Sequence, residues 1–341
     1  MRFHKYKLDV PENAPLNKTA GDKYWNKLLK EPKERILSLW TTQNESAKKK
    51  KKFIDHVCIV GIETSKYCNR KCSYCPDSIA KYERSKQTLM SEKIWKRILD
   101  DLIELDYKST ISLNLYNEAL ADPTIFHKIT EVKECLPNSF VKFNSNGDFL
   151  TIQMLEKLKQ SGLDALFISL HPPMNKPYED NDRIKAHEKF YKKIGYDGNY
   201  HNIVHGKSIR TDLNFEGMRV LIMSDNWYDT GTNRGGLVEN AVKIYKNRED
   251  PCWRPYREFI ISCDGSVVPC CQIFPDEITN EKYFWGNVSN MKIWDIYSKE
   301  IADEWRRELF KYHPKKAPCD DCSDPCQDDP ANKDIRNSII G

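Results

Sequence analysis

Two hydrophobic patterns alternate between residues 57 and 223. Short continuous apolar runs are typical of buried parallel strands, whereas apolar residues repeated every three or four positions are typical of helices. Strands are expected at residues 57–63, 110–115, 139–143, 165–170 and 217–223. Because helical patterns separate these runs, we expect repeated βα units, a parallel sheet and right-handed crossovers. Periodicity does not determine whether that sheet closes into a barrel.

The helices between the strands carry recognisable end signals. Ser91 is a suitable N-cap for a helix with apolar residues at positions 94, 98, 102 and 105. Pro123 opens a second helix, which is expected to run to residue 135. A third helix covers residues 151–160 and ends at Gly162.

Two segments lie outside this regular pattern. The first 55 residues are polar and basic, with one amphipathic helix expected at residues 24–40 and Pro32 breaking or kinking it. The lysine run at residues 48–52 is interpreted as a solvated linker rather than a nucleic-acid contact. Residues 174–215 are expected to cap the mouth of the sheet domain, with His187 and the other histidines at the surface.

Charge and composition narrow the class of protein. The formal net charge is only +4 in 341 residues, which disfavours a nucleic-acid partner. No apolar run approaches the ~18–20 residues that cross a bilayer, and the N-terminus lacks the apolar region of a signal peptide. The chain has 12 cysteines. Without an export signal they favour a reducing cytoplasm and metal binding over disulfide pairing.

Three of these cysteines form the chain's most informative motif, Cys68-x₃-Cys72-x₂-Cys75, directly after the first strand. Cysteine thiolates are the usual ligands of iron–sulfur clusters. Three of them leave one iron of a four-iron cluster open to a small molecule. Zinc normally takes four closed ligands, so a zinc knuckle is the alternative that fits less well.

This motif resembles the radical S-adenosylmethionine (radical SAM) superfamily. The resemblance implies a [4Fe–4S] cluster on the three cysteines, with SAM chelating the open iron through its amino and carboxylate groups. It implies that Tyr74 contacts the adenine. It also implies an α/β fold with a partial, open (β/α)₆ barrel.

Later strand ends resemble the family's SAM-binding segments. Asn117-Glu118 lies where relatives hold the SAM ammonium group, and a cationic amine there needs a carboxylate acceptor. Asn117 and Ala119 depart from the family's glycine and proline, while the acidic residue is kept. Ser145-Asn146 resembles the segment that contacts the ribose and the methionyl carboxylate, and Ser169 is a similar candidate. His171 is assigned no role.

A second cysteine set follows the turn Asn233-Arg234-Gly235-Gly236, which itself resembles a turn that closes the barrel in relatives. The set resembles SPASM and shorter twitch domains, and the surrounding sequence predicts an Asp264-Gly265 hairpin. The resemblance implies one auxiliary [4Fe–4S] cluster. Its expected ligands are Cys252, Cys270, Cys319 and Cys322, with Cys326 as a possible replacement; a zinc ribbon would need the same spacing. Cys263 and Cys271 are left as packing residues or hydrogen donors.

We therefore expect a basic N-terminal extension at residues 1–55, a partial barrel at 56–236 and a small cysteine-rich α+β auxiliary-cluster domain at 237–341. The resemblance implies an enzyme that cleaves SAM reductively and abstracts a substrate hydrogen. Flavodoxin or ferredoxin would donate the electron. Oxidation or epimerisation of a sugar-like or other small metabolite is the first expectation, and modification of a ribosomal peptide the second. The alternative from another functional class is a metal-binding module without catalytic activity.

Overall fold

The computed structural model describes most of the chain. The described residues are 2–6, 19–80, 88–172, 176–199, 201–238, 247–324, 328 and 331–340. Cys326 lies outside them, so its expected role as a ligand has no structural counterpart here. None of the described helices combines the length and the apolar character that a membrane crossing requires.

The described strands form a single eleven-stranded sheet in the order β1-β7-β8-β5-β4-β3-β2-β9-β10-β11, with β6 paired to β7. Six central strands, β8, β5, β4, β3, β2 and β9, run parallel to their neighbours. The strands are β1 (Phe3–Lys5), β2 (Ile59–Ile62), β3 (Thr110–Ser112), β4 (Phe140–Ser145), β5 (Ala165–Ser169), β6 (Asn202–Val204), β7 (Ser208–Phe215), β8 (Met218–Asp225), β9 (Glu258–Ile261), β10 (Ser266–Val268) and β11 (Gly286–Asn287). The α/β class with an open, mostly parallel sheet is therefore confirmed.

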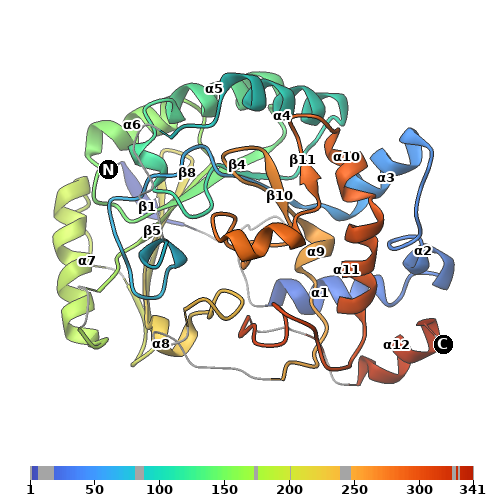
Figure 1. Ribbon diagram of the computed structural model, residues 1–341. Coiled ribbons are helices and arrows are strands. Elements are labelled where there is room, and N and C mark those ends of the chain that lie inside the picture. The colour runs from blue at the N-terminus through green and yellow to red at the C-terminus, as the bar shows by residue number, and fades with distance from the viewer. Residues whose placement is uncertain are drawn as a thin grey trace.

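Helices α4 to α7 form an arc along one side of this sheet, and the C-terminal helices α10 and α11 lie at its other end beside α1 and α3 (Figure 1). The helices are α1 (Thr19–Leu28), α2 (Lys33–Leu37), α3 (Ser46–His56), α4 (Glu92–Glu104), α5 (Ile125–Cys135), α6 (Ile152–Gln160), α7 (Asp180–Ile194), α8 (Trp227–Thr230), α9 (Arg254–Arg257), α10 (Ile293–Tyr297), α11 (Glu300–Phe310) and α12 (Asn332–Ile340). Three short 3₁₀ turns are η1 (Pro76–Ser78), η2 (Ala119–Ala121) and η3 (Ile278–Tyr283).

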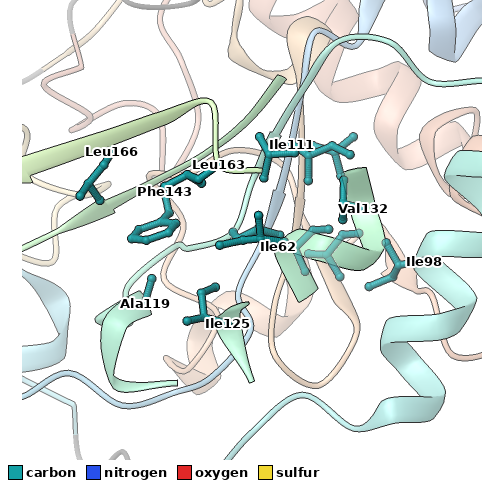
Figure 2. Packing of buried hydrophobic residues seen from close by; sticks show 14 of the residues in the cluster. Ile62, Ile98, Ile111, Ala119, Ile125, Val132, Phe143, Leu163 and Leu166 are labelled. Carbon is teal, nitrogen blue, oxygen red and sulfur yellow. The ribbon is translucent and has the colours of Figure 1, made fainter. Parts of the chain in front are cut away.

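The main hydrophobic core lies between the sheet and these outer helices. Figure 2 shows Ile62 of β2 and Ile111 of β3 packed with Ile98 of α4 and Val132 of α5. All four side chains are almost completely buried. The opposite side of the sheet carries a smaller apolar cluster of Ala165, Phe167 and Leu221, and polar residues lie beside it and at the strand ends.

Several local expectations are confirmed. The Ser91 hydroxyl accepts a hydrogen bond from the Ile94 amide at 3.3 Å and caps α4. The predicted hairpin is formed by β9 and β10, which pair antiparallel around Gly265. The β9 strand also pairs in parallel with β2, so the C-terminal segment supplies the sixth parallel strand of the sheet.

The N-terminal expectations include one confirmation and one correction. Pro32 breaks the helical segment at residues 24–40 as expected, because α1 ends at Leu28 and Pro32 stands as the N-cap of α2. The lysine run is not a linker but part of α3. Three of its lysines pair with carboxylates of other elements, and the pair between Lys52 and Asp303, at 2.6 Å, is buried. A run of like charges is solvated only if no opposite charges face it in the fold.

The segment 174–215 also differs from expectation. It contains the helix α7 and the strands β6 and β7, which the hydrophobic pattern did not indicate. His187 is fully buried and not at the surface: its Nε2 lies 3.0 Å from the Ser224 hydroxyl and its Nδ1 3.3 Å from the Tyr191 hydroxyl. His205 is exposed, as expected.

Candidate active site

A cavity of about 160 Å³ opens where the loops that follow the parallel strands meet. Parallel strands end at one edge of their sheet, so residues far apart in sequence converge there. The lining comes from the loop after β2 and from the ends of β3, β4, β5 and β8. It comprises Cys68, Arg70, Cys72, Tyr74, Cys75, Asn114, Leu115, Tyr116, Asn117, Glu118, Asn144, Ser145, Asn146, Ser169, His171, Trp227 and Arg234. Every candidate residue predicted around the first cysteine motif is among them.

The cysteine loop is held by its own backbone. The Cys75 amide donates to the Cys72 carbonyl at 2.9 Å, and the Ser78 amide donates to the Cys75 carbonyl at 2.9 Å. All three thiols are free and face the same cavity. Burial raises their pKa values, that of Cys68 to about 12. Three unpaired thiols directed into one polar cavity are a donor set that fits a four-iron cluster with one open iron.

Glu118 lies on the wall beside these cysteines with its carboxylate largely satisfied. The Ser145 hydroxyl donates to Oε1 at 2.7 Å and the Leu120 amide donates to the same oxygen at 3.1 Å. The Asn146 amide donates to Oε2 at 2.7 Å. A carboxylate has about four acceptor positions, so one position on Oε2 is left for a donor in the cavity. Burial raises the pKa of Glu118, while these hydrogen bonds oppose that rise.

A polar clamp connects the cysteine loop to the end of β4. Arg70 donates two hydrogen bonds to Asp148, at 2.7 and 2.5 Å, and Asn69 donates a third to the same carboxylate at 2.8 Å. The Asn146 amide group donates to Asn69 at 2.8 Å. The Arg70 guanidinium is the first cause of the lowered pKa of Asp148. This clamp sets the position of the loop, and the sequence analysis did not identify it.

One wall of the cavity is formed by the rings of Tyr74, His171 and Trp227. The sequence indicated only Tyr74. The Tyr74 ring stacks on Trp227 with centroids 5.1 Å apart and planes 12° apart. Its hydroxyl lies 2.7 Å from Nδ1 of His171. Burial lowers the pKa of His171 to about 4, so its imidazole is neutral near pH 7 and can accept that bond. The only available signal was position, because His171 and Trp227 follow β5 and β8 directly.

The second cysteine set gathers behind this cavity. Cys252, Cys270 and Cys322 are buried, and Cys319 is half-buried. The pKa of Cys270 is raised first by burial and then by the charges of neighbouring thiols, those of the other three among them. In the described part of the chain, no three His, Cys, Asp or Glu side chains converge closely enough to hold a single metal ion.

The segment next to Cys270 connects the two cysteine sets. The Tyr116 hydroxyl, at the cavity wall, donates to the Cys271 carbonyl at 2.8 Å. Arg234 donates to the side chain of Gln272 at 3.3 Å. Arg254 donates to the Cys271 sulfur at 3.2 Å, to Glu258 at 2.6 Å and to Asp324 at 2.9 Å. The second set thus lies directly behind the wall formed by Tyr116 and Arg234.

The two leftover cysteines occupy different environments. Cys263 belongs to the hydrophobic core, with its thiol 3.8 Å from the Thr88 carbonyl oxygen. Cys271 is held against Arg254. Neither thiol is part of the described cavity lining.

Comparisons with known proteins agree with this geometry. The model of the radical SAM superfamily matches residues 62–208. The model of an iron–sulfur cluster-binding domain, SPASM, matches residues 252–323.

Two curated proteins and one crystal structure are similar over most of the chain. The S-adenosyl-L-methionine-dependent 2-deoxy-scyllo-inosamine dehydrogenase of Niallia circulans is 24% identical over 267 residues, covering 78% of this chain and 92% of that protein. A tungsten-containing aldehyde ferredoxin oxidoreductase cofactor-modifying protein of Pyrococcus furiosus is 22% identical, covering 77% of this chain and 86% of that one. The crystal structure of BtrN with AdoMet and 2-DOIA has a TM-score of 0.58 at 21% identity, covering 80% of this chain and 96% of that one. At this identity the structural likeness establishes the fold.

Proposed function

The chain belongs to the radical SAM superfamily and carries a C-terminal SPASM domain, and we propose that it oxidises a hydroxyl group of a small, sugar-like molecule. Its cofactors are [4Fe–4S] clusters and SAM. The observation that carries the proposal is that three free thiols and the Glu118 carboxylate line one cavity, with the second cysteine set behind its wall. The named reaction of the N. circulans relative supports oxidation as the outcome.

Each part of the cavity has a separate task in this proposal. Cys68, Cys72 and Cys75 hold the first cluster, and the free acceptor position of Glu118 binds the SAM ammonium group. The wall of Tyr74, His171 and Trp227 receives the adenine, because stacked rings offer a flat apolar surface with hydrogen-bonding edges. The remaining polar groups around the ribose and the methionyl carboxylate are Asn117, Ser145, Asn146 and Ser169.

The second set, Cys252, Cys270, Cys319 and Cys322, would hold the auxiliary cluster. Cys326 stays an alternative ligand that falls outside the described residues. When bound, the cofactors would supply a radical that takes a hydrogen atom from the substrate carbon and a closed cluster that takes one electron, while the hydroxyl group releases its proton. The chain's own contribution is to hold that carbon between the two sites and to keep water out.

Oxidation is favoured over epimerisation because epimerisation needs a hydrogen donor in the cavity. Cys263 lies in the hydrophobic core, and Cys271 lies against Arg254 rather than in the described lining. Either thiol would have to move to donate. We further propose flavodoxin or ferredoxin as the electron donor and the cytoplasm as the compartment, since the described cysteines are all free and the clusters are sensitive to oxygen. The division at residues 55 and 236 is kept as a proposal for the domain limits.

The experiment uses anaerobically reconstituted full-length protein, SAM, dithionite and cyclitol or sugar probes in deuterated water. Production of 5′-deoxyadenosine with a product two hydrogens lighter than the probe is the expected result. Deuterium at the abstracted carbon, lost in Cys271→Ser but kept in the exposed-thiol control Cys135→Ser, would establish an epimerase instead. Failure of reconstituted protein to cleave SAM would leave only a non-catalytic metal-binding module.

A further inference from the structure

A buried lysine lies one residue layer below the cavity. Lys142 is on β4, two positions before the cavity-lining Asn144, so both side chains project from the same side of the strand. Its ammonium group donates to the Ser112 hydroxyl at 3.2 Å, and that hydroxyl donates to Asn114 at 3.4 Å. The ammonium also lies 5.2 Å from the centroid of the Phe167 ring. Since Asn114 lines the cavity too, two hydrogen bonds connect Lys142 to it.

The charge of Lys142 has no direct counter-charge in the described part of the chain. Its one hydrogen-bond acceptor there is a neutral hydroxyl. Glu258 attracts it electrostatically, but the Glu258 carboxylate already accepts from Arg254 at 2.6 Å and from the Cys271 amide at 3.4 Å. Burial lowers the pKa of Lys142 to about 8. A buried cation without a counter-charge is costly, and such perturbed groups cluster at functional sites.

A second cation faces the same region. Arg234 lines the cavity, and its Nε is buried without a hydrogen-bond partner among the described residues. Its other contact is with the neutral side chain of Gln272 at 3.3 Å, and its guanidinium lies 5.8 Å from the Tyr116 ring centroid. The charges of Arg234 and Lys142 both interact with the Cys271 sulfur. Both cations therefore lie near Cys271, the residue that follows the expected ligand Cys270.

Negative groups at the cavity are already occupied. Glu118 is the only carboxylate in the described lining, and it accepts three hydrogen bonds. Asp148 is engaged by Arg70 and Asn69. A cationic substrate would thus meet Arg234 in the lining, the charge of Lys142 beneath it and no available carboxylate. An oxyanion would instead contact Arg234 and be attracted by the charge of Lys142, which reaches the lining through Ser112 and Asn114.

We propose that the substrate carries an oxyanion, either a phosphate or a carboxylate, and that Lys142, together with Arg234, selects it. This inference rests on the proposed function, because it places the oxyanion on the molecule that is oxidised. The competing explanation is that the two cations offset the negative charge of an auxiliary cluster and contact no substrate. The two explanations predict different results for a variant in which the charge of Lys142 is removed.

The test compares four probes that share one ring and differ in charge: D-glucose, D-glucosamine, D-glucuronate and D-glucose 6-phosphate. Binding to reconstituted full-length protein with SAM is measured by anaerobic calorimetry. We expect at least one of the two anions to bind about 10-fold or more tightly than glucose and glucosamine. Whether glucuronate or glucose 6-phosphate binds more tightly distinguishes a carboxylate from a phosphate. Equal affinity for all four, or no detectable binding of the anions, would overturn the proposal.

The variant Lys142→Met removes the charge and keeps much of the apolar stem. It should reduce the preference for anions over glucose about 10-fold or more, while iron content stays that of the parent protein. The control Lys108→Met removes an exposed lysine that pairs with Asp106, and the preference should not change. A preserved preference in Lys142→Met, accompanied by a changed spectrum of the auxiliary cluster, would assign the lysine to the cluster. The proposed function is tested separately, by SAM cleavage in the parent protein and by the mass of the product formed from each probe.

Discussion

Replacing Glu118 by glutamine tests the SAM site most directly. The Glu118 carboxylate accepts from Ser145, Leu120 and Asn146, which leaves one acceptor position on Oε2 for the SAM ammonium group. A glutamine carries no charge and cannot present two acceptor oxygens. If its amide nitrogen takes the place of Oε2, it faces the Asn146 amide, donor against donor. If it takes the place of Oε1, it faces the Leu120 amide.

The size of the effect can be worked out from these contacts. A hydrogen bond to a charged group contributes about 1.5–3 kcal/mol, and every 1.4 kcal/mol is about a factor of ten in affinity. Loss of the ammonium contact should therefore weaken SAM binding about 10- to 150-fold. The amide that loses its acceptor costs about 1–3 kcal/mol in the free energy of unfolding. Iron content should not change, because Glu118 is not one of the residues expected to bind the iron of the cluster.

The dissociation constant of SAM is measured by anaerobic equilibrium dialysis, and stability by denaturant unfolding of the same preparations. Glu131→Gln is the matched control. Glu131 accepts a hydrogen bond from the Trp95 indole at 2.7 Å and lies outside the cavity lining, so this variant should lose stability without losing SAM affinity. A SAM affinity for Glu118→Gln within about threefold of the parent would refute the assigned role. An equal loss of affinity in both variants would mean that general destabilisation is the cause.

Two further outcomes can be measured independently. Reconstituted protein should contain about eight iron atoms per chain. A Cys68/Cys72/Cys75→Ala variant should keep about half of this iron and lose all SAM cleavage. Metal analysis that finds about one equivalent of zinc and no second cluster would contradict the auxiliary cluster. Burial holds the pKa of His187 at about 3, below the 6.5 of an unfolded chain, so the unfolded state takes up the proton first and stability falls as pH drops below about 6.5. At pH 5, protonation of His187 in the unfolded state lowers the free energy of unfolding by about 2 kcal/mol. Between pH 7 and pH 5 the parent should therefore lose about that much more unfolding free energy than His187→Gln. Identical pH dependence in the two proteins would show that the pKa of His187 is the same in the folded and unfolded states.

Local sequence patterns predicted the helices α4 to α6, the strands β2 to β5 and the first cysteine loop, but not the helices α3 and α7 or the strands β6 and β7. Ser91 caps its helix as expected, because capping depends on residues three positions apart. The motif at Cys68 and the polar residues at Glu118, Ser145 and Ser169 could be placed together because parallel strands end at one edge of their sheet. Short-range pattern and topology placed these residues near one another, and the resemblance to the radical SAM superfamily supplied their expected roles.

The tertiary structure alone decided which charges and rings meet. No spacing indicates that Trp227 stacks on Tyr74 or that Asp148 clamps Arg70, since the partners are 153 and 78 positions apart. The lysine run appeared solvated until its fold partners, such as Asp303, were known. His187 and Lys142 look like ordinary polar residues in the sequence. In the structure His187 is fully buried, and Lys142 lies beneath the cavity. Burial and pairing energies arise between segments that only the folded sheet brings together, so a linear pattern cannot encode them.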